Sequence, residues 1–172
     1  MTFKLNEFIS NVKNRGLAVQ NRFWVMIPPP VIMSKDNREI SVFCKSVTIP
    51  GVNIATSPER LTGEVSEIPY DRNFGMASMI FWNRADFDTR DYFERWIDGI
   101  QNPRTRILSY YNDYKSDIQV TVLDKMDVPK YRVELHSAHP KSVGALSLDN
   151  DTPGVMSFDV QFDYKYYTME RV

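Results

Sequence analysis

Residues 156–166 of the chain read MSFDVQFDYKY, and this alternation is the strongest structural signal in the sequence. Apolar side chains fall on every second position and polar ones between them, the pattern of a strand with one buried and one solvated face. Such alternation is typical of antiparallel sheets, which pack one face on the core. We therefore predict a long C-terminal strand in an antiparallel sheet.

Two shorter alternating segments precede this strand, at residues 118–122 and 131–135. The polar connection between them predicts a β-hairpin. After the hairpin, His139 and Pro140 predict a bend, which leads into a short strand at residues 143–148. The second half of the chain is therefore expected to be rich in strands.

Three more strands are predicted nearer the N-terminus. Residues 22–27 are mostly apolar, and the prolines at 28–30 end that strand because proline has no N–H to donate. Residues 39–48 are rich in β-branched side chains and predict a second strand. Residues 76–82 carry large apolar side chains at both parities, which predicts a central strand covered on both faces.

The hydrophobic period changes to that of a helix between residues 88 and 103. The apolar stripe of this helix comprises Tyr92, Phe93, Trp96, Ile97 and Ile100. We expect Asp88 or Thr89 to cap its start and Asn102-Pro103 to end it. A short amphipathic helix is also predicted over residues 5–12.

Together these segments predict a mainly β fold: two packed antiparallel sheets, as a sandwich or barrel, with a flanking α-helix and a short N-terminal helix. The 172 residues are expected to form a single domain, residues 1–172. Within it, residues 52–72 are thinly apolar, with Ile54, Val65 and Ile68 spread among polar residues and prolines. This segment is too polar for a core, and we predict an extended arm or hairpin there.

Charge and cysteine content exclude several classes of protein. Lys and Arg number 21 against 22 Asp and Glu, so the chain has no basic excess with which to bind nucleic acid on its own. The single cysteine, Cys44, allows no intrachain disulfide and no cysteine-based zinc cluster. No apolar run is long enough to span a membrane, so we expect no membrane insertion and synthesis in the cytoplasm.

Candidate catalytic residues are scarce. The two histidines, His136 and His139, leave a predicted strand together and are interpreted as structural. Cys44 lies in an apolar strand and is interpreted as a small buried side chain rather than a nucleophile. No glycine-rich phosphate loop is present. We therefore predict no enzymatic activity, no catalytic or metal site and no cofactor.

A short basic stretch, Arg104-Thr105-Arg106, lies close to Tyr110 and Tyr111. Basic residues interleaved with aromatic rings are typical of single-stranded nucleic acid binding. Acidic residues follow closely, at Asp113 and Asp117. We therefore favour a connection whose aromatic residues cover the core or contact another subunit.

Five segments, in order, resemble a known family. They read NRFWV at 21–25, FCKSVTIPG at 43–51, FERWIDGIQNP at 93–103, PKSVGALSLD at 140–149 and MSFDVQFDY at 156–164. Each is weak alone, but their order and spacing resemble the tail tube family of T-even-like contractile-tail bacteriophages. That family includes the major tail tube protein and the tube-initiator proteins of the baseplate.

The resemblance implies a structural protein of the virion tail. Six copies would form a ring with a continuous inner β-barrel, and rings would stack into a tube through which viral DNA passes into the host without specific binding. Neighbouring rings, sheath proteins and baseplate proteins are the expected partners. The alternation in the last strand suggests Asp159, Gln161 and Asp163 as residues lining the lumen. The candidates for contacts between subunits lie in the arm: Glu59, Arg60, Glu64, Glu67, Asp71 and Arg72.

Several alternatives remain open at this point. The N-terminal helix at 2–12 and the sequence Gln101-Asn102-Pro103 are similar to the tube-initiator branch, whereas the lack of an extension after Tyr167 is similar to the major tube branch, which we place first. A tube subunit of a type VI secretion-like injection system is a further candidate. A monomeric ligand-binding β-barrel, with Trp24, Trp82 or Trp96 as a stacking platform, is the remote alternative.

Overall fold

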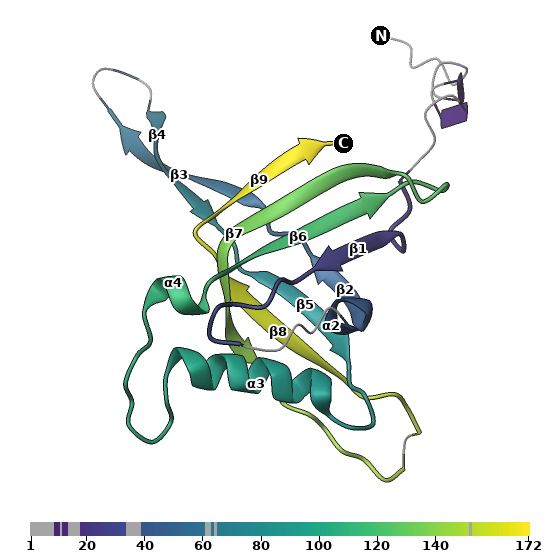
Figure 1. Ribbon diagram of the computed structural model, residues 1–172. Coiled ribbons are helices and arrows are strands. Elements are labelled where there is room, and N and C mark those ends of the chain that lie inside the picture. Colours follow the sequence, from purple (N-terminus) through teal and green to yellow (C-terminus); the bar gives the residue numbers. More distant parts are fainter. Residues whose placement is uncertain are drawn as a thin grey trace.

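The computed structural model describes residues 9–10, 12–13, 18–33, 39–60, 63, 65–151 and 153–172. Its body consists of two antiparallel sheets that share the long strand β7 (Pro129–Val143) (Figure 1). Sheet A has the order β1 (Phe23–Met26), β6 (Ser116–Leu123), the first part of β7 and β9 (Tyr166–Arg171). Sheet B has the order β7, β8 (Ser157–Asp163), β5 (Ala77–Trp82) and β2 (Cys44–Thr48).

The mainly β class, the two packed sheets and the flanking helix are confirmed, but the barrel alternative is wrong. Strand β1 ends the hydrogen-bonded path on one side and β2 ends it on the other, and the two are not paired with each other. Each sheet therefore keeps an open edge. A single copy is a sandwich with an opening between these edge strands.

Strand β5 lies between β8 and β2 in sheet B, in the central position that its apolar sequence predicts. Its core face is fully buried, with Met79 and Phe81 at 0% exposure. The opposite face is only half-buried. The predicted hairpin of β6 and β7 is also present, with Ile118 paired with Leu135 and Val120 with Val133.

The predicted helix is α3 (Asp88–Ile100), which packs its aromatic stripe on the core face of sheet B (Figure 1). The Phe93 ring lies 4.8 Å from Phe81 and 6.0 Å from Phe162 between centroids. The Trp96 indole donates a 2.8 Å hydrogen bond to the Tyr114 carbonyl. Aromatic packing of this kind adds to the stabilisation that area burial supplies.

The expected cap of α3 is wrong. Its N-cap position is Phe87, with a left-handed φ of 61° and no side-chain capping bond. The N–H of Asp88 at the start of the helix instead donates a 3.2 Å hydrogen bond to the Asp86 carboxylate in the preceding turn.

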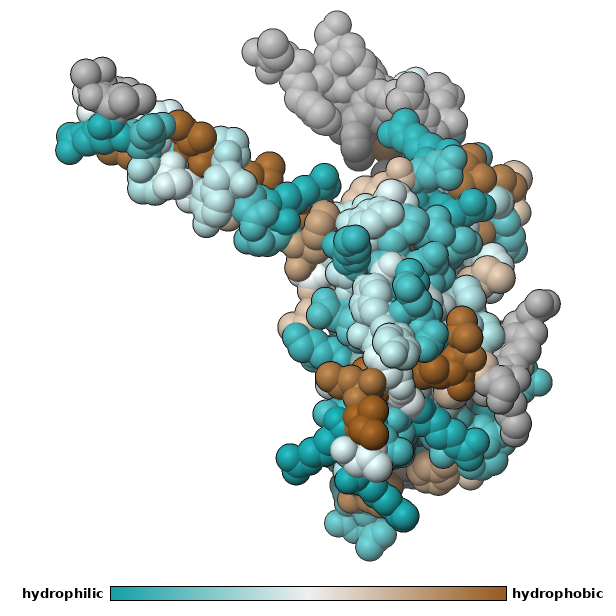
Figure 2. Space-filling view, turned by 60° about the vertical axis from the view of Figure 1, so that its left-hand side comes forward, coloured by the Kyte–Doolittle hydropathy of each residue, from teal (hydrophilic) through white to brown (hydrophobic). Residues whose placement is uncertain are grey.

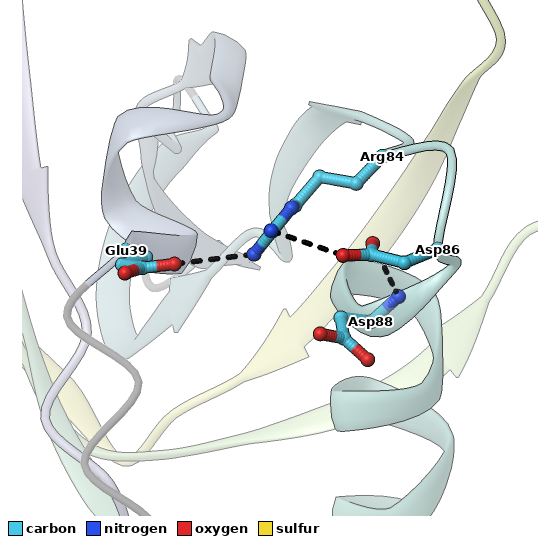
Figure 3. A network of polar contacts seen from close by, with 4 residues as sticks. All are labelled: Glu39, Arg84, Asp86 and Asp88. Atoms are coloured by element: carbon cyan, nitrogen blue, oxygen red, sulfur yellow. Dashed lines mark hydrogen bonds and ion pairs between the residues drawn. The ribbon is translucent and has the colours of Figure 1, made fainter.

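The strand predicted over residues 39–48 is half wrong, because Glu39–Val42 is the short helix α2. Tertiary contacts outweigh the β propensity of this stretch. Ile40 turns into the core and the Ser41 hydroxyl accepts a 3.3 Å bond from the Ile27 N–H. Arg84 then joins α2 to the turn before α3, with ion pairs to Glu39 at 3.1 Å and to Asp86 at 3.0 Å (Figure 3).

Two C-terminal predictions also need correction. The strand at residues 143–148 is absent, because β7 itself runs through Pro140 and ends at Val143. The long strand at 156–166 is divided into β8 and β9, which pair with different parts of β7 and belong to different sheets. Between them, the Tyr164 hydroxyl donates to the Gly75 carbonyl and fixes the crossing point.

Residues 52–74 form a hairpin that stands away from the body, made of β3 (Val52–Glu59) and β4 (Ser66–Phe74) (Figure 1). The one-turn helix α4 (Tyr111–Tyr114) follows the connection after α3. The predicted N-terminal helix over 5–12 lies mostly outside the described residues. No helix among the described residues is both long and apolar enough to cross a membrane.

Candidate assembly surface

The hairpin of β3 and β4, called the arm below, is exposed on both faces. Its two strands pair only with each other. Ile54 is 60% exposed and Tyr70 is 70% exposed. Figure 2 shows the arm projecting from the body, with hydrophobic residues along it between hydrophilic ones. An isolated two-stranded hairpin is marginally stable in water, so an arm of this kind gains stability from a partner surface.

The strand register gives the arm two different faces. Val52, Ile54 and Thr56 share a face with Arg72 and Phe74, whereas Ala55 shares the other with Asp71 and Ile68. On the first face the Arg72 guanidinium lies 5.2 Å from the Phe74 ring. A register shift between Ala55 and Thr56 bends the arm and leaves a shallow hollow of about 520 Å³. Its lining residues are Val52, Ile54, Pro69, Tyr70, Asp71 and Arg72.

The charged arm residues named from the sequence are spread along the hairpin. Glu59, Arg60 and Glu67 lie toward the tip, and Asp71 and Arg72 lie nearer the body. Their contacts are local: Glu67 accepts a 3.0 Å bond from Thr56, and Arg60 donates to the Gly63 carbonyl at 3.3 Å. Within the described part of the chain, none of these five charges enters an ion pair. Glu64 lies outside the described residues.

A second unfilled region is the opening between the edge strands β1 and β2. A hollow of about 620 Å³ lies there, and Phe23, Val47, Ile49, Val120 and Val122 form the apolar part of its lining. On the outer face of β1, Trp24 is 50% exposed. Unpaired edges with exposed apolar side chains favour pairing with another chain.

The three residues proposed for the lumen lie together on the outer face of sheet B. Phe158, Val160 and Phe162 of β8 are buried, so Asp159, Gln161 and Asp163 point away from the core. Residues with short hydroxyl side chains share this face through strand pairing, namely Ser46, Thr48, Ser78, Ser142 and Ser157. Lys45 also reaches this face, where its ammonium lies 4.4 Å from the Trp82 ring. We call this surface the β8 polar face.

Close packing holds Asp159 in place on the β8 polar face. The Gly144 N–H donates a 2.7 Å bond to the Asp159 carbonyl. A Cβ added at Gly144 would lie only 1.8 Å from a carboxylate oxygen of Asp159. Glycine is therefore required at this position for steric reasons.

The two histidines have different surroundings and do not form a pair. His139 is half-buried beside the Tyr114 ring at 5.3 Å, and burial lowers its pKa below the ordinary 6.5. His136 stacks on Tyr166 at 4.5 Å and hydrogen-bonds the Thr168 hydroxyl. Each histidine thus packs against a tyrosine ring.

Strand pairing brings two carboxylates to His136, an arrangement that sequence spacing does not reveal. The ligand atoms of Asp117, Glu134 and His136 lie within 4.8 Å of one another on sheet A. Asp117 accepts a 2.7 Å bond from the Ser137 N–H, and Glu134 accepts one from Gln119 at 3.3 Å. All three side chains thus take part in hydrogen bonds across neighbouring strands.

Cys44 is half-buried on β2, where its thiol donates to the Ser46 carbonyl at 3.6 Å. Burial raises the pKa of this thiol to about 12. A thiol rather than a thiolate is therefore present at neutral pH, which makes Cys44 unsuited to nucleophilic attack.

The contact candidates named from the sequence are all charged, whereas the structure also exposes apolar side chains in the arm. The most exposed of these are Tyr70 at 70%, Ile54 at 60% and Val65 at 57%. The signal was present in the sequence, since large apolar residues in a segment that contributes nothing to the core are unusual on a soluble surface.

Known proteins support the same architecture. The family model of the phage tail tube proteins matches residues 18–170. A chain from the cryo-EM structure of an extracellular contractile injection system, the PVC sheath–tube complex in its extended state, superposes with a TM-score of 0.70 at 15% identity, covering 95% of this chain and 97% of that one.

Two further structures have the same fold at lower similarity. A chain of the anti-feeding prophage tube terminating cap gives a TM-score of 0.70 at 15% identity, covering 91% of this chain and 92% of that one. Hcp1 from E. coli EAEC 042 gives 0.55 at 11% identity, covering 87% and 91%. No curated protein sequence matches the chain significantly.

These similarities agree with the sandwich, the flanking helix and the projecting arm. The structures at such low identity establish the fold, and the sequence model over residues 18–170 establishes the relationship. The first two of these structures are described as a sheath–tube complex and a tube terminating cap. The chain belongs to the phage tail tube protein family.

Proposed function

We propose that six copies of this chain close into a ring and that rings stack to form the inner tube of a contractile phage tail. The observation that carries the proposal is the pair of open sheet edges at β1 and β2. Natural proteins rarely leave long sheet edges unprotected, and closure with neighbouring copies removes them. The six-fold number comes from the resemblance to the contractile tail tubes.

The arm supports the stacking part of the proposal. Its exposed apolar side chains, and the five described charges that enter no ion pair among the described residues, are available to a partner from another copy. We assign contacts between subunits to Glu59, Arg60, Glu64, Glu67, Asp71 and Arg72. Sheath and baseplate proteins are the expected outer partners, and the assembled tube belongs to the virion after synthesis in the host cytoplasm.

We assign the β8 polar face to the lumen, through which viral DNA passes. Lys45 adds one positive charge to the face that carries Asp159 and Asp163, and short hydroxyl side chains share the rest of that face with Ile80 and Trp82. Such a wall carries little net charge and no cationic cluster. Because DNA affinity grows with the number of neutralised phosphates, this wall would let a duplex slide without holding it.

Negative-stain microscopy of the purified protein, with light scattering to determine mass, tests the ring. We expect hexameric rings or hollow filaments. A chain that stays monomeric at every concentration, above all one stabilised by a small ligand, would refute the proposal. Filaments that grow from the protein alone favour the major tube protein, whereas a ring that never extends favours the baseplate tube-initiator.

A charge variant tests the lumen assignment. Asp163→Lys adds two positive charges per copy to the β8 polar face, and we expect its tubes to retain duplex DNA at low salt and release it as salt rises. Asp151→Lys is the matched control, because Asp151 is an exposed carboxylate in the loop before β8. Cryo-EM of the tubes locates the face directly, and an outward-facing Asp163 would exclude this assignment.

A further inference from the structure

The connection between α3 and α4, residues 101–110, is a second exposed apolar surface, far from the arm. Ile107 and Leu108 are each 68% exposed, and Tyr110 is 83% exposed. Neighbouring apolar side chains on a connection are usually turned inward or covered. We call residues 101–110 the receiving loop.

The receiving loop is held in one conformation by its own hydrogen bonds. The Asn102 side chain accepts bonds from the N–H groups of Arg104 at 2.9 Å and Thr105 at 3.2 Å. The Asn102 N–H donates to the Ile107 carbonyl at 3.1 Å, and Gln101 pairs with Leu108 as a β-bridge. A fixed loop that presents apolar residues outward is preorganised for binding.

The base of the receiving loop is tied to α3 as well. The Ser109 N–H donates to the Ile100 carbonyl at 2.9 Å, and its hydroxyl donates to the Gly99 carbonyl at 2.6 Å. These bonds anchor both ends of the loop to the body. The exposed apolar residues of the loop therefore lie on a segment that is anchored to the body and not on a flexible one.

The charges of the receiving loop select its partner. The loop carries Arg104 and Arg106 and contains no acidic residue. The face of the arm that carries Ile68, which is 45% exposed, also carries the exposed carboxylates of Glu59 and Asp71. Basic and apolar groups on one surface thus match acidic and apolar groups on the other, which gives specificity to an association.

The positions of the two surfaces decide which copy supplies the arm. In Figure 1 the arm projects from the upper left of the molecule and the α3–α4 connection lies at the lower left, at opposite ends of the body. Figure 2 shows hydrophobic patches low on the same side from which the arm projects. Because the two surfaces differ, their pairing is head-to-tail. Their places at opposite ends of the body favour a contact between successive rings over one within a ring.

We propose that the receiving loop of one copy binds the arm of a second copy in the next ring. Ile107, Leu108 and Tyr110 then cover Ile68 on the arm, while Arg104 and Arg106 meet Glu59 and Asp71. This inference rests on the proposed tube, and it names the surface on which one ring receives the next.

The test separates stacking from ring formation. In the double variant Ile107→Ser and Leu108→Ser we expect rings of normal mass, with the protein concentration needed for filaments raised at least about tenfold. Val42→Ser is the matched control, since Val42 is 78% exposed on α2, away from the loop. Thermal unfolding of each variant checks that the fold is intact.

A charge exchange identifies the arm as the partner. Arg104→Glu with Arg106→Glu should impair filaments, as should Glu59→Arg with Asp71→Arg. Combining both pairs of changes in one chain should restore them. Absence of that rescue, or filaments that form normally with the altered loop, would overturn the inference while leaving the ring intact. Loss of the rings themselves in the loop variant would also overturn it, because the loop would then act within a ring. A monomeric wild-type protein would refute the tube and this inference together.

Discussion

The body and the arm are built from the same antiparallel pairing, yet alternating side chains are buried in the body and exposed in the arm. In the body, alternating residues such as Phe81 and Phe162 reach 0% exposure between the sheets and α3. In the arm, Ile54 and Tyr70 remain 60% and 70% exposed. Hydrogen-bonded pairing alone supplies little net stability, so the body folds by burial whereas the arm depends on a second molecule.

This difference also divides function between the two regions. The body fixes the positions of its edges and of the β8 polar face, because a close-packed core tolerates little movement. We expect the arm to stay adaptable in the single copy and to order on contact with a partner. A subunit with a stable body and a dependent arm can remain soluble before assembly and become rigid within a tube.

The largest expected effect is in the core. Phe93→Ala removes a fully buried ring that contacts Phe81, Phe158 and Phe162, and we expect a loss of about 3–5 kcal/mol in the free energy of unfolding. Tyr70→Ala in the arm, at 70% exposure, should change the monomer by no more than about 0.5 kcal/mol. Urea titrations of both variants measure the contrast, and equal losses would show that the arm is part of the core.

Substitutions at two glycines test the same contrast between the body and the arm, with a smaller expected change in the free energy of unfolding. Gly144→Ala in the body forces the Asp159 carboxylate to move, because the new Cβ would lie 1.8 Å from it, and we expect a loss of about 1–3 kcal/mol. Adding Asp159→Ala should recover part of that loss. Gly51→Ala at the base of the arm meets no atom within 4 Å and should be neutral or slightly stabilising. Chemical denaturation of the three variants checks this, and an unperturbed Gly144→Ala variant would contradict the packing described for Asp159.

Much of the body follows from the sequence, because the periods of its strands and of α3 record which side chains are buried. The core face of β8 and the stripe of α3 are read directly from such patterns. The hydrophobic periods do not show which strands pair with each other. The alternation of residues 156–166 continues smoothly across Tyr164, and only the contacts with Gly75 and β7 reveal that two strands in different sheets meet there.

The errors elsewhere have local physical causes. Glu39–Val42 has the composition of a strand, but burial of Ile40 and the ion pair between Glu39 and Arg84 favour one turn of helix. The arm charges were recognisable from the polar composition of residues 52–72. For the receiving loop, the sequence left core cover and subunit contact open, because Ile107 and Leu108 look like ordinary buried residues until the fold turns them outward.

A prediction of smaller energy concerns the order of the arm itself. In the dissociated chain, we expect the β3 and β4 amides to open with a free energy of about 0–1 kcal/mol, because no core covers them. Amides of β5 and β8 should open only with global unfolding. Assembly should protect the arm strongly. Hydrogen exchange measured by mass spectrometry compares both states, and an arm protected like β5 in the monomer would abolish the distinction between the two regions.

The smallest expected effect is a pH dependence confined to the body. Burial is the main cause that lowers the pKa of His139, the nearby Asp163 opposes this change, and Lys141 adds to it. As pH falls below about 6.5, the unfolded chain binds a proton before the folded chain does, so stability present above that pH is progressively lost. His139→Gln should flatten this acid slope in pH-dependent thermal unfolding, whereas His136→Gln should keep it. The half-buried His139 lies where β7 passes from sheet A to sheet B. If the loss of stability at acid pH survives the His139→Gln change, acid acts on assembly surfaces rather than on this joint between the sheets.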